Sequence, residues 1–330
     1  KLRYMMKAVR FNHTNGLTFE QGEINLPEAT DDQVLVKVEY VGLSFIDTKV
    51  ANCPCEETPN RVFGVDAVGI VEKACKTGFP EPGTRVFWHG DIREHGTMSE
   101  FALVPSHALT VLPTNVDGKL AAASIAPAMC ALIALFKLQL NAGDTVLIES
   151  AHHPVGQMAI QFAKQLGLGV AACSESKHKK LLEKLGADLV YCHPDFAGLA
   201  DALQLHFGAA EVQGALDVTG THTQQLIAHL TFCGRVSCLA GLPAIEQHIL
   251  MKKAPNIGIV SLCGSWLSNS VCAQQRMAFI GNALAEKLEK NEITLQQLES
   301  ISPQHDAIIE TLEKLGSCDN IAFFVADMER

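Results

Sequence analysis

The residues best placed to do chemistry form a short turn, Ala151-His152-His153-Pro154-Val155-Gly156. An apolar run, Thr145–Glu149, precedes the turn and is typical of a buried strand. The segment Val155–Leu166 follows it and carries apolar residues at helical spacing. The N–H groups at a helix N-terminus and the helix dipole together favour an anion such as a dinucleotide pyrophosphate. We therefore expect all six turn residues to contact a cofactor.

The turn departs from the glycine-rich pattern that is usual for a pyrophosphate. Glycine allows the backbone to approach the phosphates closely and to take unusual φ angles. In this turn Gly156, at the last position, is the one glycine. Pro154 fixes φ and lacks an N–H, although proline is well tolerated in the first turn of a helix. The imidazole of His153 can donate to a phosphate in place of a lost contact. We predict that cofactor binds, but more weakly than to a glycine turn; the alternative is a chain that has lost the cofactor and serves as a binding or regulatory protein.

The end of the next predicted strand, Gly169–Cys173, bears on the choice of cofactor. An acidic residue at this place binds the ribose 2′-hydroxyl of NAD. Here Ser174 stands near that place, and Ser176 and Lys179 follow within a lysine-rich stretch. Small hydroxyls and lysines suit a 2′-phosphate, so NADPH is favoured over NADH, with these three residues as contacts. A shift of one position would instead make Glu175 the ribose acid and favour NADH.

The elements that position this turn follow from the pattern of the whole chain. Short β-like runs separated by Gly, Pro, Asn and Asp fill residues 6–113. An Ala-rich helix follows at Leu120–Leu138, and strands and helices alternate from residue 144 onwards. We predict an α/β fold, with a Rossmann doubly wound parallel sheet at 121–267. A mainly β domain is predicted at 1–120, completed by residues 268–330.

Composition limits the classes of partner. The 330 residues carry a formal net charge of −10, which argues against nucleic acid and anionic membrane surfaces as partners. We expect no apolar run to reach the roughly 20 residues that span a bilayer. The opening lacks a signal-peptide core, so a cytoplasmic protein is expected, with either Met5 or Met6 as a possible start. The 11 cysteines are then expected to be thiols.

Five short motifs occur in order along the chain and carry a resemblance. They are Gly64–Val71 (GVDAVGIV), Pro82–Val86 (PGTRV), Gly96–Phe101 (GTMSEF), Leu185–Asp188 (LGAD) and Cys233–Val236 (CGRV). This series resembles the medium-chain dehydrogenase/reductase superfamily over nearly the whole chain. The resemblance implies a GroES-like N-terminal domain, a Rossmann domain and a C-terminal return to the first domain.

The same resemblance points to a branch without zinc. Where zinc-dependent members carry a cysteine in a C-x-x-D segment and a histidine before an acid, this chain has Ser44 and Val65. A catalytic zinc needs three protein ligands, and these two side chains cannot supply the missing ones. No cysteine lies between Cys75 and Cys130, where the structural zinc lobe would be. The chain resembles the zinc-independent quinone oxidoreductase-like branch; an alcohol dehydrogenase is the disfavoured alternative, and no metal is expected.

The resemblance also suggests site residues. Ser44, Asp47 and Lys49 occupy the segment that lies near the nicotinamide in this branch, so they are the candidate catalytic residues. Tyr191 resembles a tyrosine near the adenosine phosphate. Gly241 and Trp266 complete the candidate cofactor contacts.

Three further expectations concern substrate and assembly. Trp88, His89 and His95 follow the PGTRV motif, and one of them is expected to line the pocket, although lone histidines are more often plain polar residues. The resemblance implies that the small-molecule substrate is a quinone or an α,β-unsaturated carbonyl. It also implies that the run Ile257–Cys263 pairs across the edge of a homodimer, and exposed strand edges favour such pairing.

Overall fold

The computed structural model describes residues 5–13, 16–26, 28–52, 61–193 and 195–329. The chain forms two units, which we describe separately. The first unit comprises residues up to Met129 together with those from Leu262 onwards, and the second unit comprises Cys130–Ser261. The boundaries therefore lie at residues 129 and 262, where the sequence suggested 120 and 268. The first boundary falls inside one long helix. The hydrophobic pattern of that helix is continuous, so the sequence gives no sign of a boundary there.

The second unit is built on a parallel sheet of six strands. Their order, β10-β9-β8-β11-β12-β13, places the first strand of the unit in the middle, as in a Rossmann domain. Every neighbouring pair runs parallel. The predicted doubly wound fold is confirmed. The strands are β8 (Thr145–Ile148), β9 (Gly169–Cys173), β10 (Leu189–Tyr191), β11 (Val212–Asp217), β12 (Leu230–Cys238) and β13 (Asn256–Ile259).

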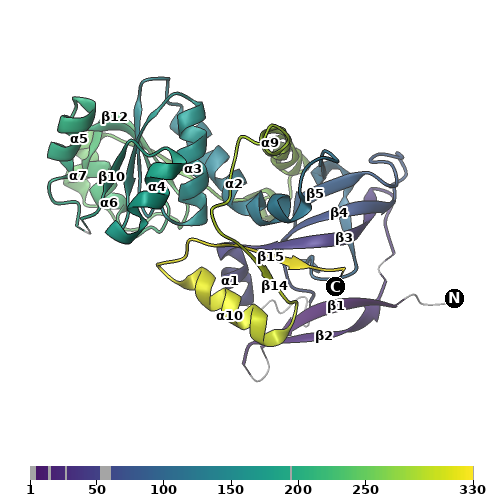
Figure 1. The fold of residues 1–330 in the computed structure, drawn as a ribbon. Coiled ribbons are helices and arrows are strands. Elements are labelled where there is room, and N and C mark those ends of the chain that lie inside the picture. Colours follow the sequence, from purple (N-terminus) through teal and green to yellow (C-terminus); the bar gives the residue numbers. More distant parts are fainter. Residues whose placement is uncertain (1–4, 14–15, 27, 53–60, 194, 330) are drawn as a thin grey trace. The chain divides into compact units, whose positions relative to one another are not determined.

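Helices cover both faces of this sheet, as Figure 1 shows. Helices α3 and α4 pack together on one face, and α5, α6 and α7 cover the other. Leu203, Leu226 and Ile227 are fully buried in the cluster under the second group of helices. The helices are α3 (Pro154–Gln165), α4 (Lys179–Leu185), α5 (Leu199–Phe207), α6 (Thr223–Ala228) and α7 (Gln247–Lys253), with a 3-10 turn η2 (Ser176–His178) before α4.

The first unit is built on a mixed sheet of seven strands. The path β14-β15-β3-β4-β5-β7 carries β6 as an additional partner of β3. The C-terminal strand β15 lies antiparallel beside β3, so two strands far apart in the sequence are neighbours in one sheet. The strands are β3 (Gln33–Leu43), β4 (Asp66–Lys73), β5 (Arg85–His89), β6 (Phe101–Pro105), β7 (Thr110–Val111), β14 (Leu298–Ile301) and β15 (Phe323–Asp327).

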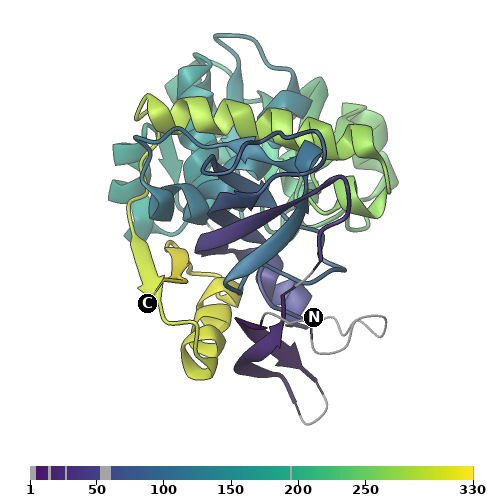
Figure 2. The same ribbon diagram turned by 90° about the vertical axis from the view of Figure 1, so that its right-hand side faces the viewer.

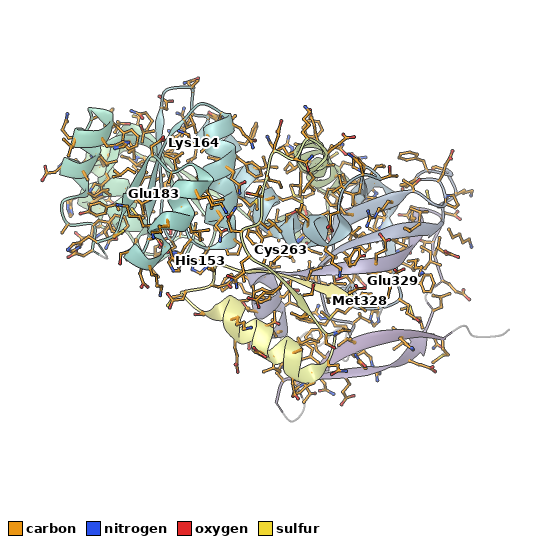
Figure 3. All side chains as sticks on the ribbon, in the orientation of Figure 1. His153, Lys164, Glu183, Cys263, Met328 and Glu329 are labelled. Carbon is orange, nitrogen blue, oxygen red and sulfur yellow. The ribbon has the colours of Figure 1, made fainter. Side chains whose placement is uncertain are left out.

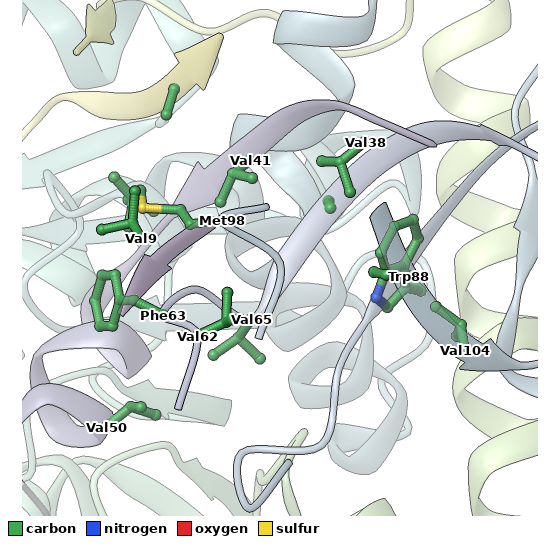
Figure 4. Close-up of a cluster of buried hydrophobic side chains, with 14 of the residues drawn as sticks. Val9, Val38, Val41, Val50, Val62, Phe63, Val65, Trp88, Met98 and Val104 are labelled. Atoms are coloured by element: carbon green, nitrogen blue, oxygen red, sulfur yellow. The ribbon is translucent and has the colours of Figure 1, made fainter. Parts of the chain in front are cut away.

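A hairpin and several helices complete the first unit. Strands β1 (Met5–Asn12) and β2 (Thr18–Asn25) pair in an antiparallel hairpin. Figure 2 shows the hairpin beside α10, where Gln21 donates to the carbonyl of Pro303. Valine and aromatic side chains fill the core, among them Val41, Phe63 and Trp88 (Figure 4). The helices are α1 (Phe45–Ala51), α8 (Gly264–Leu267), α9 (Val271–Glu289) and α10 (His305–Gly316), with a 3-10 turn η1 (Ser106–Ala108).

One long helix corrects an expectation about apolar runs. Helix α2 (Gly118–Leu138) is 21 residues long and, by length and composition, could cross a membrane. The expectation that no segment reaches this length was therefore wrong. However, 72% of the 18-residue apolar segment of this helix is buried, as is typical of a helix in the core of a folded protein. Pro127 also lies inside the helix. The finding is weak support for a membrane segment.

The elements that the sequence did not suggest are short or polar. Strand β2 carries Glu20, Gln21 and Glu23 among its eight residues, and most of the strand is exposed or half-buried. It therefore lacks the apolar alternation by which a strand is recognised in a sequence. Strand β14 lies at the edge of its sheet and has four residues. Helix α1 has seven residues, too few to show helical periodicity.

Candidate functional site

The turn between β8 and α3 packs against itself through Gly156. A Cβ built on Gly156 would lie 2.6 Å from the Cα atom and 2.6 Å from the carbonyl oxygen of Ala151. Ala151 is fully buried, and its N–H donates to the carbonyl of Cys173 at the end of β9. Only glycine permits this contact between strand end and helix, the role of the third glycine in a dinucleotide turn. The turn therefore keeps the one glycine that its packing requires.

Helix α3 begins at this turn and presents donors there. His153 is the N-cap residue, at φ −63° and ψ 153°, and Pro154 is the first helical residue. Figure 3 shows His153 at the start of the helix and Lys164 near its end. The N–H groups of Val155 and Gly156 lie in the first turn, where a helix offers no acceptor of its own. These two groups, in a 12-residue helix, are suited to a phosphate.

The histidines of the turn take different positions. His152 is buried, and its Nδ1 lies 2.8 Å from Oγ of Ser174. Its ring stacks on that of His178, with centroids 4.5 Å apart and planes 7° apart. The ring of His153 lies 4.5 Å from that of His152. Three imidazoles and a hydroxyl thus gather at the carboxyl ends of β8 and β9, where a dinucleotide fold places the adenosine half of its ligand.

The residues after β9 are charged and largely exposed. Lys177 forms an ion pair with Glu175 at 3.2 Å, and Lys179 lies 3.8 Å from Glu183. Exposed pairs of this kind contribute little to stability, so both lysines can turn to a phosphate at small cost. Ser176 begins the 3-10 turn that leads into α4. Ser174, Lys177 and Lys179 thus lie in the segment that leads from the end of β9 to the start of α4.

Two other predicted contacts lie at the same edge of the sheet. The hydroxyl of Tyr191 donates to the carbonyl of Ala197, and burial raises the pKa of this phenol above its ordinary value. Gly241 follows β12 with φ +94°, and a Cβ there would meet nothing within 4 Å. A side chain at Gly241 would therefore meet no neighbour, and the positive φ is the reason that glycine suits this position.

A buried glutamate at this edge was not predicted as a site residue. The side chain of Glu149 accepts from the N–H groups of Val218 and Thr219, both at 3.1 Å, and from the hydroxyl of Thr219 at 2.9 Å. Ser150 and His222 also contact it. The carboxylate ties the loop after β8 to the loop after β11, at the point where the strand order reverses. The sequence held one signal for this residue, because Glu149 is an acidic residue at the end of an apolar run.

Of the three predicted catalytic residues, two lie together in the interior of the first unit and the third lies on its surface. Ser44 and Asp47 are buried, and Oδ2 of Asp47 accepts from the N–H of Ser44 at 2.8 Å. This contact is part of the N-terminal cap of α1. Lys49 is exposed, with its Nζ 5.2 Å from the ring centroid of Phe45. The structure thus brings Ser44 to Asp47 and leaves Lys49 on the surface of α1.

A pocket in the first unit collects side chains from several elements. The space in it that a water-sized sphere can occupy is about 10 Å³, which is room for about one water molecule. Trp88 and His89 of β5 line it, together with Met129 of α2 and Trp266 of α8. The indole N–H of Trp266 donates to the carbonyl of His89 at 3.0 Å. Trp266, predicted as a cofactor contact, therefore lies in the pocket wall, and Trp88 and His89, two of the three candidates that follow the PGTRV motif, line the pocket as well.

The third candidate, His95, is structural. Its Nδ1 accepts from the N–H of Val62 at 3.2 Å. Burial lowers the pKa of His95 below its ordinary value, which favours the neutral ring that this bond needs. His95 is therefore outside the lining of the pocket.

His89 forms a buried pair with Asp66 of β4. Nδ1 of His89 lies 2.6 Å from Oδ1 of Asp66, and both side chains are 1% exposed. Oδ2 of Asp66 accepts from the N–H of Ala126 at 3.1 Å. Nε2 of His89 is buried and has no hydrogen-bond partner among the described residues. Asp47 also has such an atom, Oδ1.

The residues of this region do not resemble a zinc centre. Ser44 and Val65 stand at the two places where zinc-dependent relatives were expected to carry ligands. Within the described ranges, no group of three or more His, Cys, Asp or Glu side chains is close enough to hold a metal ion. Cys53 and Cys55 lie outside those ranges.

Comparisons with known proteins cover both units. The family described as an alcohol dehydrogenase GroES-like domain matches residues 30–114, and the family described as a zinc-binding dehydrogenase matches residues 154–282. A zinc-type alcohol dehydrogenase-like protein of Staphylococcus epidermidis is 30% identical over 201 residues, which are 57% of this chain and 60% of that protein. The chain therefore spans less than two thirds of this relative.

Two further relatives are reductases by name. A trans-enoyl reductase of Aspergillus terreus is 31% identical over 226 residues, covering 60% of this chain and 75% of that protein. A quinone oxidoreductase of Rattus norvegicus is 26% identical over 326 residues, covering 94% and 96%. A mycobacterial protein solved in complex with NADPH has a TM-score of 0.82 at 21% identity, over 98% of this chain and 99% of that one. Likeness at that identity shows the fold.

Proposed function

Because this chain belongs to the medium-chain dehydrogenase/reductase superfamily, we propose that it is a zinc-independent, NADPH-dependent oxidoreductase. Its proposed substrate is a quinone or an α,β-unsaturated carbonyl compound. The observation that carries the proposal is the contact of Gly156 with Ala151 at the head of α3. A chain that no longer bound a dinucleotide would have no need to keep this turn closed around two free N–H groups.

The residues of the second unit fit the pyrophosphate end of a dinucleotide. Val155 and Gly156 offer N–H groups there, and His153 offers an imidazole beside them. At the adenosine end, Ser174 and Lys179 suit a 2′-phosphate. The relatives named for quinone and enoyl reduction and the NADPH-bound structure support this choice of cofactor and reaction.

When bound, the reduced cofactor supplies a hydride to the substrate. The chain's own residues must then position a polarised double bond, exclude water and provide a proton. Trp88, Met129 and Trp266 give the pocket of the first unit a largely apolar wall, but this pocket has room for about one water molecule and is too small to hold the substrate. The proposed substrate class is therefore supported by the relatives named for quinone and enoyl reduction.

A second candidate function rests on a different observation. Glu149 already occupies the N–H groups of Val218 and Thr219, and the ring of His152 is buried at the adenosine end. If the chain's own side chains occupy the cofactor's place in this way, the cofactor does not bind, and the chain would be a binding or regulatory protein. An alcohol dehydrogenase with zinc is the third candidate, disfavoured by Ser44 and Val65.

Titration of the purified protein with NADPH and with NADH separates these functions. A ligand at 100 times its Kd stabilises the folded state by about 2.7 kcal/mol, which is visible as a rise in Tm. We expect NADPH to raise Tm and to show enhanced nicotinamide fluorescence, with NADH weaker. The absence of binding for both at millimolar concentration would replace the reductase with the binding protein. Measurement of bound zinc by mass spectrometry tests the alcohol dehydrogenase.

A further inference from the structure

One hydrogen bond between side chains joins the loops that follow β8 and β9. Nδ1 of His152, in the turn after β8, lies 2.8 Å from Oγ of Ser174, the first residue after β9. His152 is only 5% exposed. Burying a polar ring costs free energy unless its nitrogens are hydrogen-bonded, so this bond stabilises the position of both side chains. The hydroxyl of Ser174 is therefore held at the end of β9.

The backbone of both partners is held as well. Gln157 of α3 is fully buried and donates from its side chain to the carbonyl of His152 at 2.7 Å. The N–H of Ser174 donates to the carbonyl of Tyr191, at the end of β10, at 3.1 Å. The bond between His152 and Ser174 thus connects two segments that α3 and β10 keep in place.

A second imidazole packs against the ring of His152. It belongs to His178, the last residue of the 3-10 turn η2, which is 8% exposed. The two rings are parallel within 7°, and their centroids are 4.5 Å apart. The stack fixes the plane of the His152 imidazole, and the bond to Ser174 selects the edge of the ring that faces the end of β9. The direction of Nδ1 is therefore determined by two contacts.

The residue next to Ser174 is held less firmly. The side chain of Glu175 is exposed, and its carboxylate pairs with the exposed Lys177 at 3.2 Å, a kind of contact that breaks at little cost. A hydroxyl, and not a carboxylate, is thus fixed where the second strand of a dinucleotide fold meets the ribose. Ser174 is partly exposed, and Glu175 and Ser176 are exposed, so a ligand can reach this end of the strand.

We infer that His152 is a positioning residue that makes the proposed reductase prefer NADPH to NADH, because it holds the Ser174 hydroxyl ready to donate to a 2′-phosphate. The inference rests on the proposed function and deepens it, since it names the residue that sets the choice of cofactor. Nδ1 of His152 donates to Oγ of Ser174, and the hydroxyl of Ser174 donates to the phosphate. His152 thus acts through Ser174, without touching the ligand itself.

The direction of these hydrogen bonds follows from the charge of the ligand. A serine hydroxyl has one proton to donate. A phosphate monoester well above its second pKa, which is about 6, accepts hydrogen bonds and donates none. The proton of Ser174 then goes to the phosphate, so the proton between Ser174 and His152 belongs to Nδ1. The 2′-hydroxyl of NADH carries no charge, and its hydrogen bond to Ser174 is correspondingly weaker.

Substitutions at both ends of the bond test the inference. His152→Leu fills the buried space and removes the bond, whereas His152→Asn keeps a polar group close to the former Nδ1. Ser174→Ala removes the hydroxyl, and a double variant combines His152→Leu with Ser174→Ala. His206→Leu is the matched control, because His206 is exposed near the end of α5, at the edge of the sheet where β11 begins. Circular dichroism and Tm establish that each variant is folded.

Fluorescence titration gives Kd for NADPH and for NADH, and their ratio measures the preference. We expect Ser174→Ala to lower the preference for NADPH about tenfold or more, as the loss of a hydrogen bond to a charged group does. His152→Leu should lower it nearly as far. The double variant should fall no further than Ser174→Ala alone, because the two residues act as one unit. His152→Asn should keep most of the preference, and His206→Leu all of it.

The double variant separates a positioning role from a merely structural one. If the losses of the two single variants add, His152 acts independently of Ser174 and the inference is wrong. An unchanged preference in folded His152→Leu protein would overturn it as well, while tight binding of NADPH would leave the reductase in place. If the wild-type protein binds neither NADPH nor NADH, the proposed function itself fails, and the inference fails with it.

A second readout uses adenosine 2′,5′-bisphosphate, which carries the 2′-phosphate but no nicotinamide. In protein with 15N-labelled histidine, the resonances missing from the His152→Leu spectrum identify His152. At pH 8 the phosphate is fully ionised, and we expect Nδ1 of His152 to carry a proton when this probe is bound. A bound probe with an unprotonated Nδ1, or a probe that does not bind, would contradict the inference.

Discussion

Gly156 and Ala151 touch so closely that a single added carbon would lie 2.6 Å from the Ala151 Cα atom. Ala151 lies in the turn after β8, and Gly156 lies in the first turn of α3, so this contact joins the two elements that frame the proposed cofactor site. The obstructing atoms belong to the backbone, so they cannot rotate away as a flexible side chain would. The separation of β8 and α3 at the site is therefore set by the absence of one Cβ.

The substitution Gly156→Ala should widen this turn. We expect a loss of about 1–3 kcal/mol of stability from overpacking and a loss of NADPH affinity of at least tenfold, measured by urea unfolding and by fluorescence titration. Gly316→Ala, at the end of α10 with no atom within 4 Å of the new Cβ, is the control: it should leave the NADPH affinity unchanged and should not lower stability. Unaltered affinity in Gly156→Ala would show that the phosphates bind elsewhere.

The double substitution His153→Gly and Pro154→Gly restores a glycine turn. It adds an N–H at the first helical position and allows the backbone to approach an anion, so we expect Kd for NADPH to fall. The two glycines should also lower Tm of the free protein, because the unfolded chain gains conformational freedom. Isothermal titration calorimetry measures the affinity. An unchanged Kd would contradict the idea that the turn weakens binding.

The raised pKa of Asp47 makes a prediction about pH. The folded state holds the proton more tightly than the unfolded chain, so the stabilising effect is complete below the unfolded pKa of about 4 and is lost as pH rises through the folded pKa. Asp47→Asn cannot lose a proton. Its stability relative to wild type should therefore increase from pH 4 upwards, by roughly 1.4 kcal/mol per pH unit until Asp47 ionises. Urea unfolding between pH 4.5 and 7.5 measures it, with the exposed Asp201→Asn as control. A constant difference across this range would mean that Asp47 titrates normally.

Thiol reactivity should divide the cysteines by burial. Burial, and then the charge of Asp217, raise the pKa of Cys238 to about 12, and burial likewise raises the pKa of Cys173. At pH 8 the thiolate fraction of Cys238 is then roughly a thousandfold below that of an ordinary thiol. We expect iodoacetamide to label the exposed cysteines within minutes and these two only after unfolding, as peptide mass spectrometry can show. Among the described residues, the exposed thiols are Cys192, Cys233, Cys272 and Cys318. Fast labelling of Cys238 in folded protein would mean that the sheet opens locally.

Strand β13 lies at one end of its sheet, and we propose that this edge pairs with a second copy of the chain. Ile259 on this strand is 46% exposed. Ile259→Lys should place like charges near one another across a paired edge and shift a dimer to monomer, as light scattering after size exclusion can measure. Leu205→Lys, at a 90% exposed residue of α5, is the control and should not change the mass. A wild-type monomer would exclude the pairing.

Sequence reasoning reached the parallel sheet because strands and helices there alternate with clear periods. The turn at Ala151 was recognisable for the same reason: a buried strand precedes it and an amphipathic helix follows it. The lining of the pocket was harder to predict from the sequence. Asp66 and His89 are 23 positions apart in the sequence and meet only because β4 and β5 pair with Asp66 opposite His89. Lys49 illustrates the converse, since its place in a family motif says nothing about which way the side chain faces on α1.

The insertion of β15 beside β3 has a consequence for the order of synthesis. Strand β3 is made early, but its neighbour on one side, residues 323–327, leaves the ribosome only after the whole of the second unit. The second unit, residues 130–261, is continuous and can fold as soon as it emerges. During that interval the edge of β3 that later receives β15 stands open. A chaperone that shields an exposed strand edge would find its binding site on the nascent chain there, and release would coincide with the arrival of the last strand.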